Sequence, residues 1–153
     1  MTKQVVQNVG AFTQGIKDKI NENFTELYLD GLAIPKVAEV LLTAAELGGS
    51  ETATSFTFPS TGAIFLDAWV NVTDEEAGGT MDVGTAGTSN DPDGILDGVS
   101  LAATGYVGQV AGATGALRGL YMTGSDPVTV TSSGDLNSCE ATLYVSYLEL
   151  PSI

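Results

Sequence analysis

The side chains that most often carry enzyme chemistry are scarce in this sequence. The chain of 153 residues contains no histidine and a single cysteine, Cys139. A Ser-His-Asp triad and a Cys-His pair both need a histidine to move the proton, so both are excluded. One cysteine cannot form a disulfide within the chain or supply the ligands of a cysteine-based zinc site. Any acid–base chemistry would have to come from carboxylates, tyrosines or lysines.

Paired carboxylates are the remaining groups that could cleave a substrate. Glycosidases need two of them, and Asp67, Asp74, Glu75 and Glu76 are close together in the sequence, with Trp69 among them as a platform on which a sugar could stack. In a chain with 19 acidic residues such neighbours arise by chance. We therefore expect no enzymatic activity and no cofactor.

The loop of residues 90–97, NDPDGILD, concentrates oxygen ligands of the kind that calcium prefers. It lacks the order of acidic residues and the terminal glutamate of an EF-hand. Asp-Pro-Asp-Gly is also a common β-turn sequence, because proline presets φ and glycine accepts the strained position. We expect a turn and no metal site, with calcium binding at Asp91–Asp97 as the alternative.

The element that organises the chain is predicted at residues 10–28, which have the periodicity of an amphipathic helix. Its large apolar residues recur at steps of four, four, four and three and form one stripe: Phe12, Ile16, Ile20, Phe24 and Leu27. The helix is expected to end at Asp30-Gly31, and Pro35 prevents its resumption. A lone helix of this length is marginal in water. The stripe, together with Tyr28, is therefore expected to dock or self-associate.

Everything after Pro35 has the pattern of β-structure. Short runs with period-two alternation are separated by glycine, proline and aspartate, and they predict strands near residues 37–42, 55–58, 63–72, 80–84, 95–102, 127–132 and 141–150. Residues 43–47 are predicted to form a single helical turn. No alternation of strands and helices is visible, and the glycines of residues 105–119 are not followed by a Lys-Ser or Lys-Thr pair, so a phosphate-binding loop is excluded.

The strand predicted at residues 63–72 has two unlike faces. Ile64, Leu66, Ala68, Val70 and Val72 are expected on the core face, and Phe65, Asp67, Trp69 and Asn71 on the opposite face. The second face is mixed, and Trp69 is expected to contact another subunit. Together the strands predict a mainly β fold, an antiparallel β-sandwich or jelly-roll-like domain, preceded by one N-terminal amphipathic α-helix.

Charge divides the chain into two parts. Residues 1–36 contain four lysines and four acidic residues, whereas residues 37–153 contain one arginine and fifteen acidic residues, which accounts for the net charge of −14. We therefore predict an N-terminal arm and anchor helix at 1–36 and an acidic β-sandwich domain at 37–153. Such a surface repels nucleic acid and anionic lipid, and no apolar run approaches the ~18 residues that a membrane span needs.

One segment of the predicted helix carries a family resemblance. Residues 19–28, KINENFTELY, resemble the INxNFxELY segment common near the N-termini of tailed-bacteriophage structural proteins, both fibre-type and head-associated. Residues 40–47 and 79–85 are more loosely similar to small capsid decoration or cement proteins. The resemblance implies a virion protein assembled in the host cytoplasm, whose partner is the major capsid protein or another virion protein.

These observations lead to one expected function and two alternatives. We expect a non-enzymatic capsid decoration or cement protein that docks through its N-terminal segment and forms a homo-oligomer, with a trimer favoured. The first alternative is a tail-fibre or baseplate-attached receptor-binding protein. The second is a carbohydrate-binding module.

Overall fold

The computed structural model describes residues 35–87, 90–107, 115–124 and 126–150. The helix predicted at residues 10–28 lies outside this part of the chain. The described residues form nine strands: β1 (Pro35–Leu42), β2 (Thr52–Thr57), β3 (Ala63–Asp74), β4 (Thr80–Thr85), β5 (Asp91–Ser100), β6 (Gly105–Val107), β7 (Tyr121–Met122), β8 (Pro127–Ser132) and β9 (Glu140–Glu149). In these residues no helix is long and apolar enough to cross a membrane.

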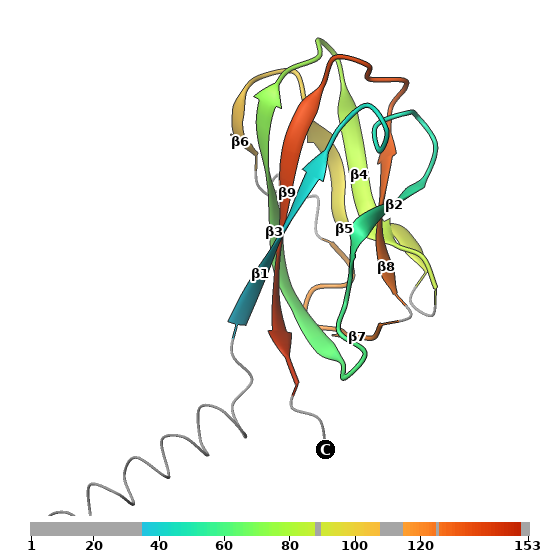
Figure 1. The fold of residues 1–153 in the computed structure, drawn as a ribbon, viewed down its shortest axis with the longest axis vertical. Coiled ribbons are helices and arrows are strands. Elements are labelled where there is room, and N and C mark those ends of the chain that lie inside the picture. Colours follow the sequence, from blue (N-terminus) through green and yellow to red (C-terminus); the bar gives the residue numbers. More distant parts are fainter. Residues whose placement is uncertain (1–34, 88–89, 108–114, 125, 151–153) are drawn as a thin grey trace, which may run out of the picture. The chain divides into compact units, whose positions relative to one another are not determined.

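The strands form two sheets that lie as two layers (Figure 1). The first sheet has the order β1-β9-β3-β6, with β7 also paired to β3, and the second has the order β2-β8-β4-β5. Every strand pair is antiparallel. The expectation of a mainly β, sandwich-like fold is confirmed for the described residues.

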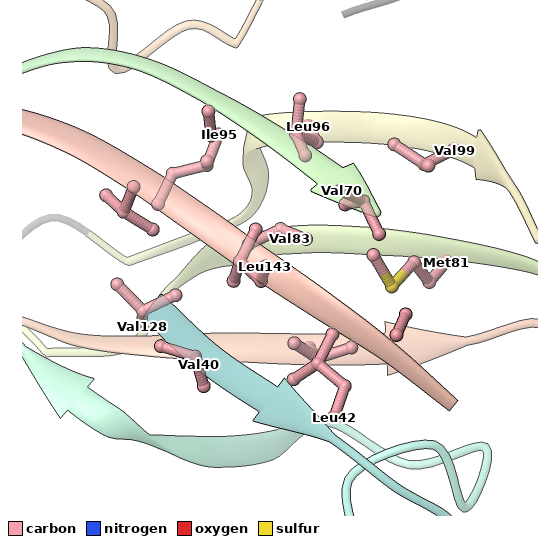
Figure 2. Close-up of a cluster of buried hydrophobic side chains, with 14 of the residues drawn as sticks. Val40, Leu42, Val70, Met81, Val83, Ile95, Leu96, Val99, Val128 and Leu143 are labelled. Atoms are coloured by element: carbon pink, nitrogen blue, oxygen red, sulfur yellow. The ribbon is translucent and has the colours of Figure 1, made fainter. Parts of the chain in front are cut away.

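The core lies between the two sheets and is built from the inward-facing residues of both (Figure 2). From β1, β3 and β9 it receives Val40, Leu42, Val70 and Leu143, and from the facing sheet Met81, Val83, Ile95, Leu96, Val99 and Val128. Alternation along β9 follows the period-two prediction, because Ala141, Leu143 and Val145 are buried and the residues between them are half-buried. Burying these apolar side chains supplies the main driving force for folding.

β3 departs from the predicted pattern at one place. Phe65 pairs with Tyr147 and Asp67 pairs with Ser146, so Leu66 has no opposite residue and forms a β-bulge. The extra residue reverses the phase of the strand: Phe65 is fully buried, whereas Ile64 and Leu66 are only half-buried. The predicted core face is therefore right beyond the bulge and wrong before it.

β5 begins earlier than predicted, and the turn expected at Asp91–Gly94 is wrong. These residues belong to β5. Val83 of β4 pairs with Leu96 and Thr85 pairs with Asp91, so β5 uses more residues than β4 over the same length of the sheet. The extra residues bulge, and both Ile95 and Leu96 become fully buried. A Cβ at Gly84 would collide with the backbone of Asp91 and Pro92, so the bulged segment packs directly on β4. Proline and glycine are tolerated in strands at bulges. The Pro-Asp-Gly sequence therefore forms a bulge here, and the chain continues along the sheet and does not reverse.

The single turn predicted at residues 43–47 is present. The backbone N–H of Leu47 donates to the carbonyl oxygen of Thr43 over 3.0 Å. The carboxylate of Glu46 accepts hydrogen bonds from both the N–H and the hydroxyl of Thr43, each at 2.9 Å. This turn carries the chain from β1 to the segment that crosses to the second sheet.

Candidate functional site

Of the residues that the sequence assigned to interactions, only Trp69 lies in the described part of the chain. Phe12, Ile16, Ile20, Phe24, Leu27 and Tyr28 lie outside the described residues. Trp69 is at the centre of β3, half-buried, between the buried residues Ala68 and Val70. Because side chains alternate along a strand, its side chain points away from the core, as the sequence predicted.

The strand register places two rows of residues side by side on the outer face of the β1-β9-β3-β6 sheet. In the first row Glu39, Tyr144 and Trp69 lie opposite one another on β1, β9 and β3. The second row crosses β1, β9, β3 and β6, and its members are Leu41, Thr142, Asn71 and Tyr106. The rows are two residues apart, or ~7 Å along the strands, so their side chains touch.

Three aromatic residues meet at the centre of this face, and we call Trp69, Tyr106 and Tyr144 the aromatic cluster. The rings of Trp69 and Tyr144 are stacked, with centroids 5.5 Å apart and planes only 9° from parallel. The ring of Tyr106 is tilted by 40° to that of Tyr144, with centroids 6.5 Å apart. Tyr106 is 73% exposed, the most exposed large hydrophobic residue in the described part. Aromatic rings arranged in this way form a rigid surface.

Three polar side chains flank the aromatic cluster and make no contact that helps to hold the described fold together. The side chains of Asn71, Thr142 and Glu39 make no hydrogen bond or ion pair within the described residues. Partial burial, with the negative charge of Glu39 and the ring of Tyr106 nearby, raises the pKa of the Tyr144 hydroxyl. The cluster therefore offers neutral hydroxyls, one amide and one carboxylate to whatever binds it.

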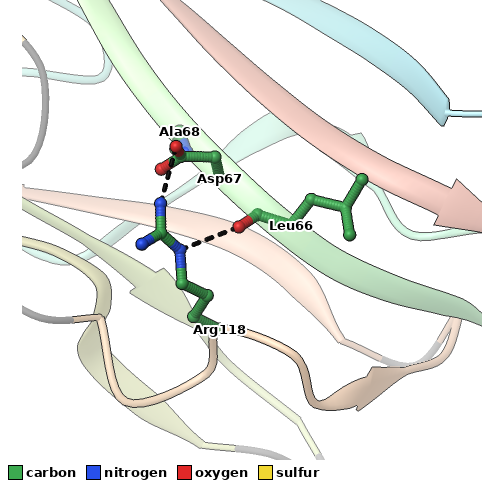
Figure 3. Close-up of polar contacts among 4 residues, drawn as sticks. All are labelled: Leu66, Asp67, Ala68 and Arg118. Carbon is green, nitrogen blue, oxygen red and sulfur yellow. Dashed lines mark hydrogen bonds and ion pairs between the residues drawn. The ribbon is translucent and has the colours of Figure 1, made fainter.

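Both cations of the described residues are already engaged in ion pairs. Arg118 binds Asp67, with Nη2 and Oδ2 2.6 Å apart, and its Nε donates to the carbonyl oxygen of Leu66 over 3.0 Å (Figure 3). That carbonyl belongs to the β3 bulge, so Arg118 satisfies a group that the bulge removed from the ladder. Lys36 pairs with Glu149 at the edge of the same sheet, and the hydrogen bond to that carboxylate raises the lysine pKa.

The carboxylates considered for catalysis are used to hold loops. Glu75 accepts a hydrogen bond from the N–H of Thr104 at 3.0 Å, and Glu76 accepts from the N–H and hydroxyl of Ser138 at 3.3 and 3.0 Å. Of the other two candidates, Asp67 is paired with Arg118, and Asp74 lies opposite Glu140 at the ends of β3 and β9. Among the described residues, Glu75, Glu76 and Asp67 are therefore each engaged by a donor or a cation, and none of these three contacts pairs two of the candidate carboxylates as a glycosidase requires.

The residues Asp91 and Asp93 do come together, in the β5 bulge. A hydrogen bond between their carboxyl groups, followed by burial and the charge of Asp93, raises the pKa of Asp91. Within the described ranges, no group of three or more histidine, cysteine, aspartate or glutamate side chains that could hold a metal ion occurs. Cys139 is buried, and burial together with Glu76 and Asp74 raises the pKa of its thiol, which keeps it protonated and unreactive.

Sequence reasoning found Trp69 but missed Tyr106 and Tyr144 as its neighbours. Tyr144 alternates with the buried residues Leu143 and Val145 along β9 and so points outward, yet nothing in the local pattern pairs it with a residue 75 positions earlier in the chain. Tyr106 lies in a glycine-spaced segment where no periodicity was visible. The signal that finds both residues is the register of β3 with β9 and β6.

Comparison with known proteins identifies the fold. No protein-family model and no curated protein matches this chain. A chain from the capsid of Ralstonia phage GP4 matches at 18% identity and a TM-score of 0.56, over 78% of this chain and 87% of that one. A chain from the acidic stable capsid of Helicobacter pylori bacteriophage KHP30 matches at 13% and 0.54, over 79% and 91%. A chain from the Cyanophage Pam1 capsid matches at 16% and 0.52, over 78% and 87%.

At these identities the likeness is one of fold, and function belongs to the specific surface residues that each chain carries. The matches cover 87–91% of the compared chains and 78–79% of this one, so the shared fold extends over most of each chain.

Proposed function

We propose that this chain is a non-enzymatic structural protein of a tailed-phage virion that decorates or cements the capsid. The observation that carries the proposal is the agreement in fold with chains from three phage capsids, over 87–91% of their lengths. The lack of histidine and the use of Glu75 and Glu76 in loop contacts support a role without catalysis. The net charge of −14 favours protein partners over nucleic acid or anionic membranes.

We further propose that the β-domain is a jelly roll. The strand orders β1-β9-β3-β6 and β2-β8-β4-β5 support this, because most connections cross between the sheets and the last strand returns beside the first. Eight strands in two facing sheets with such returns form the two Greek keys of a jelly roll. β7 adds only a two-residue pairing to β3.

Docking to the particle is assigned to the N-terminal segment, with the β-domain facing solvent. In this proposal the anchor is residues 1–36, and its contacts are Phe12, Ile16, Ile20, Phe24, Leu27 and Tyr28. Burying five large apolar side chains, at ~1.5–3 kcal/mol each, gives on the order of 10 kcal/mol before ordering costs. The apolar seam of this segment is barely two heptads, too short for a stable trimer by itself. We propose that the particle holds neighbouring copies together and so completes the favoured trimer.

The test is where the protein is found and which segment holds it there. Purified virions of the phage that encodes this chain are labelled with an antibody to the β-domain and imaged. Labelling of capsids is expected, and labelling confined to tails or fibres would replace the proposal with the tail alternative.

Two variants test the anchor on the same particles. The double variant Ile20→Asp with Phe24→Asp is expected to abolish incorporation, because it places charge in the stripe. The matched control, Gln14→Asp with Asn21→Asp, adds the same charge away from the stripe and is expected to be incorporated normally. Deleting residues 1–30 should leave a soluble β-domain with a cooperative melt; precipitation instead would show that the segment belongs to the domain's own core.

A further inference from the structure

The outer face of the β1-β9-β3-β6 sheet differs from the rest of the acidic domain. Among the described residues, the centre of the face carries one acid without an ion-pair partner, Glu39, since Asp67 is bound by Arg118. Other acids of this sheet lie at strand ends, where Asp74 pairs in register with Glu140. Aromatic rings, with the exposed Val37 and Leu41 beside them on β1, occupy the positions between these acids. A surface of this kind in a chain of net charge −14 indicates a ligand that is contacted through ring faces and neutral hydrogen bonds.

The size of the face decides between a protein and a small ligand. From Thr142 to Leu148 the face is ~20 Å long at ~3.4 Å per residue, and four strands at ~4.8 Å make it ~19 Å wide. The projected area is therefore roughly 400 Å², against the ~800 Å² that each partner of a stable protein complex buries. A second copy docked on this face alone would be held weakly. A short chain of ring-shaped units fits the same area.

The chemistry of the cluster narrows the ligand further. The faces of aromatic rings are negative and attract the weakly positive C–H groups of a sugar ring, which is how stacking onto tyrosine or tryptophan arises. The side chains of Asn71, Thr142 and Glu39 then lie between and beside the rings, where an amide and a carboxylate can bind sugar hydroxyls. Neither described cation is free to bind an anion, because Lys36 and Arg118 are paired.

We propose that the aromatic cluster of Trp69, Tyr106 and Tyr144, with Asn71, Thr142 and Glu39, binds a neutral oligosaccharide of hexose or N-acetylhexosamine units. The ligand lies across β9, β3 and β6 and stacks on the exposed ring of Tyr106. Acidic glycans and nucleic acids are repelled by the charge of the domain. This inference goes beyond the virion role and does not depend on it, since it is carried by the register and the ring geometry of the β-domain alone.

The experiment uses a reporter that the chain already contains. Trp69 is the only tryptophan, so its fluorescence reports on the cluster without labelling. The full-length protein is titrated with maltohexaose, cellohexaose and hexa-N-acetylchitohexaose, and a neutral-glycan array extends the search. A saturable change in emission with at least one neutral chain is expected, and none with the anionic hexasaccharide of hyaluronan.

Three variants connect the signal to the geometry. Tyr106→Ala and Asn71→Ala are each expected to weaken binding about tenfold, the loss of one stacking contact or one hydrogen-bonding group. Tyr121→Ala is the matched control, because Tyr121 is a half-exposed tyrosine on the same sheet that pairs with Ile64, away from the cluster. It is expected to bind as the parent does. Tyr106 is largely exposed, so its removal leaves the core intact, and a thermal melt verifies this.

Three results would overturn the proposal. The first is the absence of binding to every neutral glycan on the array together with unchanged Trp69 emission. The second is glycan binding that persists unchanged in Tyr106→Ala. The third is concentration-dependent self-association that Tyr106→Ala abolishes while no glycan binds, which would assign the face to a second copy of the chain. None of these results bears on whether the protein is found on virions, so the two proposals fail separately.

Discussion

The two outer faces of the sandwich are built from different side chains on similar backbones. On the β1-β9-β3-β6 sheet the outward positions hold Trp69, Tyr106, Tyr144, Val37 and Leu41, of which Val37 and Leu41 are 51% and 57% exposed. On the β2-β8-β4-β5 sheet the outward positions are small or polar: Ala53, Ser55, Thr57, Asp82 and Thr131. The inner sides of both sheets pack against the same buried core.

Folding alone does not explain why the first face carries large apolar side chains. Serine, threonine and aspartate are sufficient to cover a sheet, as the second face shows, and large exposed apolar side chains contribute little to stability. Clusters of exposed apolar residues on a soluble domain indicate a binding surface. The acidic, polar face is suited to keeping the protein soluble, and the aromatic face to recognition.

The comparison depends first on which residues of β3 point outward, and the bulge at Leu66 decides this. Phe65→Ala removes a fully buried ring and is expected to lower the free energy of unfolding by about 3–5 kcal/mol. Leu66→Ala is the neighbouring control, half-buried, with an expected loss below about 1.5 kcal/mol. Urea denaturation measures both. A larger loss for Leu66 than for Phe65 would mean that the bulge is absent and that the face is assigned wrongly.

On the β2-β8-β4-β5 sheet, the backbone of β5 packs closely against β4 at Gly84. Gly84→Ala is expected to cost about 1–3 kcal/mol, because the added methyl group meets the backbone of Asp91 and Pro92, which cannot move aside as a side chain would. Gly98→Asn is the control: its φ of 62° suits asparagine, and no atom lies within 4 Å of the new Cβ. A thermal melt that ranks Gly98→Asn as the more damaging change would contradict the bulged packing.

A direct comparison of the faces uses one residue from each. Trp69→Ala is expected to lower the free energy of unfolding by about 1–2 kcal/mol, since it removes the stack on Tyr144 and some buried area. Thr131→Ala, at an outward position of β8, should stay within about 0.5 kcal/mol of the parent. Denaturant midpoints of the two variants give the difference. Equal effects would show that the aromatic stack contributes nothing beyond coverage of the sheet.

The smallest expected effect is on the pH dependence of the melting temperature, through Asp91 on the β2-β8-β4-β5 sheet. The pKa of Asp91 is raised, chiefly by its hydrogen bond to Asp93, so the folded protein holds this proton more tightly than the unfolded chain does. The resulting stabilisation is present at pH values below the ordinary aspartate pKa of ~3.9 and is lost as the pH rises through the raised value. Through Asp91, acidification over this range should therefore raise the melting temperature. Asp91→Asn keeps a hydrogen-bond donor at every pH, so this rise should become smaller in the variant. Asp97→Asn removes the same charge from the same strand and should leave that rise in place.

Much of the fold could be predicted because it depends on local pattern. Period-two alternation located β8 and β9 to within one residue, and turn-forming residues separated the strands correctly around Gly62 and Gly79. The composition alone excluded histidine-dependent catalysis. These conclusions need only the identity of neighbouring residues, because side-chain direction in a regular strand and the chemistry of each residue type are local properties.

The candidate site depended on the tertiary structure, for two physical reasons. Irregular ladder geometry is set by packing against other strands: the Leu66 bulge, which Arg118 caps from a distant loop, shifted Phe65 into the core, and the β5 bulge replaced the expected turn. Register is the second reason, since a slip of one residue exchanges the two faces of a strand. Local alternation and charge were enough to predict that Trp69 points outward on an acidic β-domain. That Tyr144 and Tyr106 lie beside it follows from the pairing of β3 with β9 and β6, which no local pattern contains.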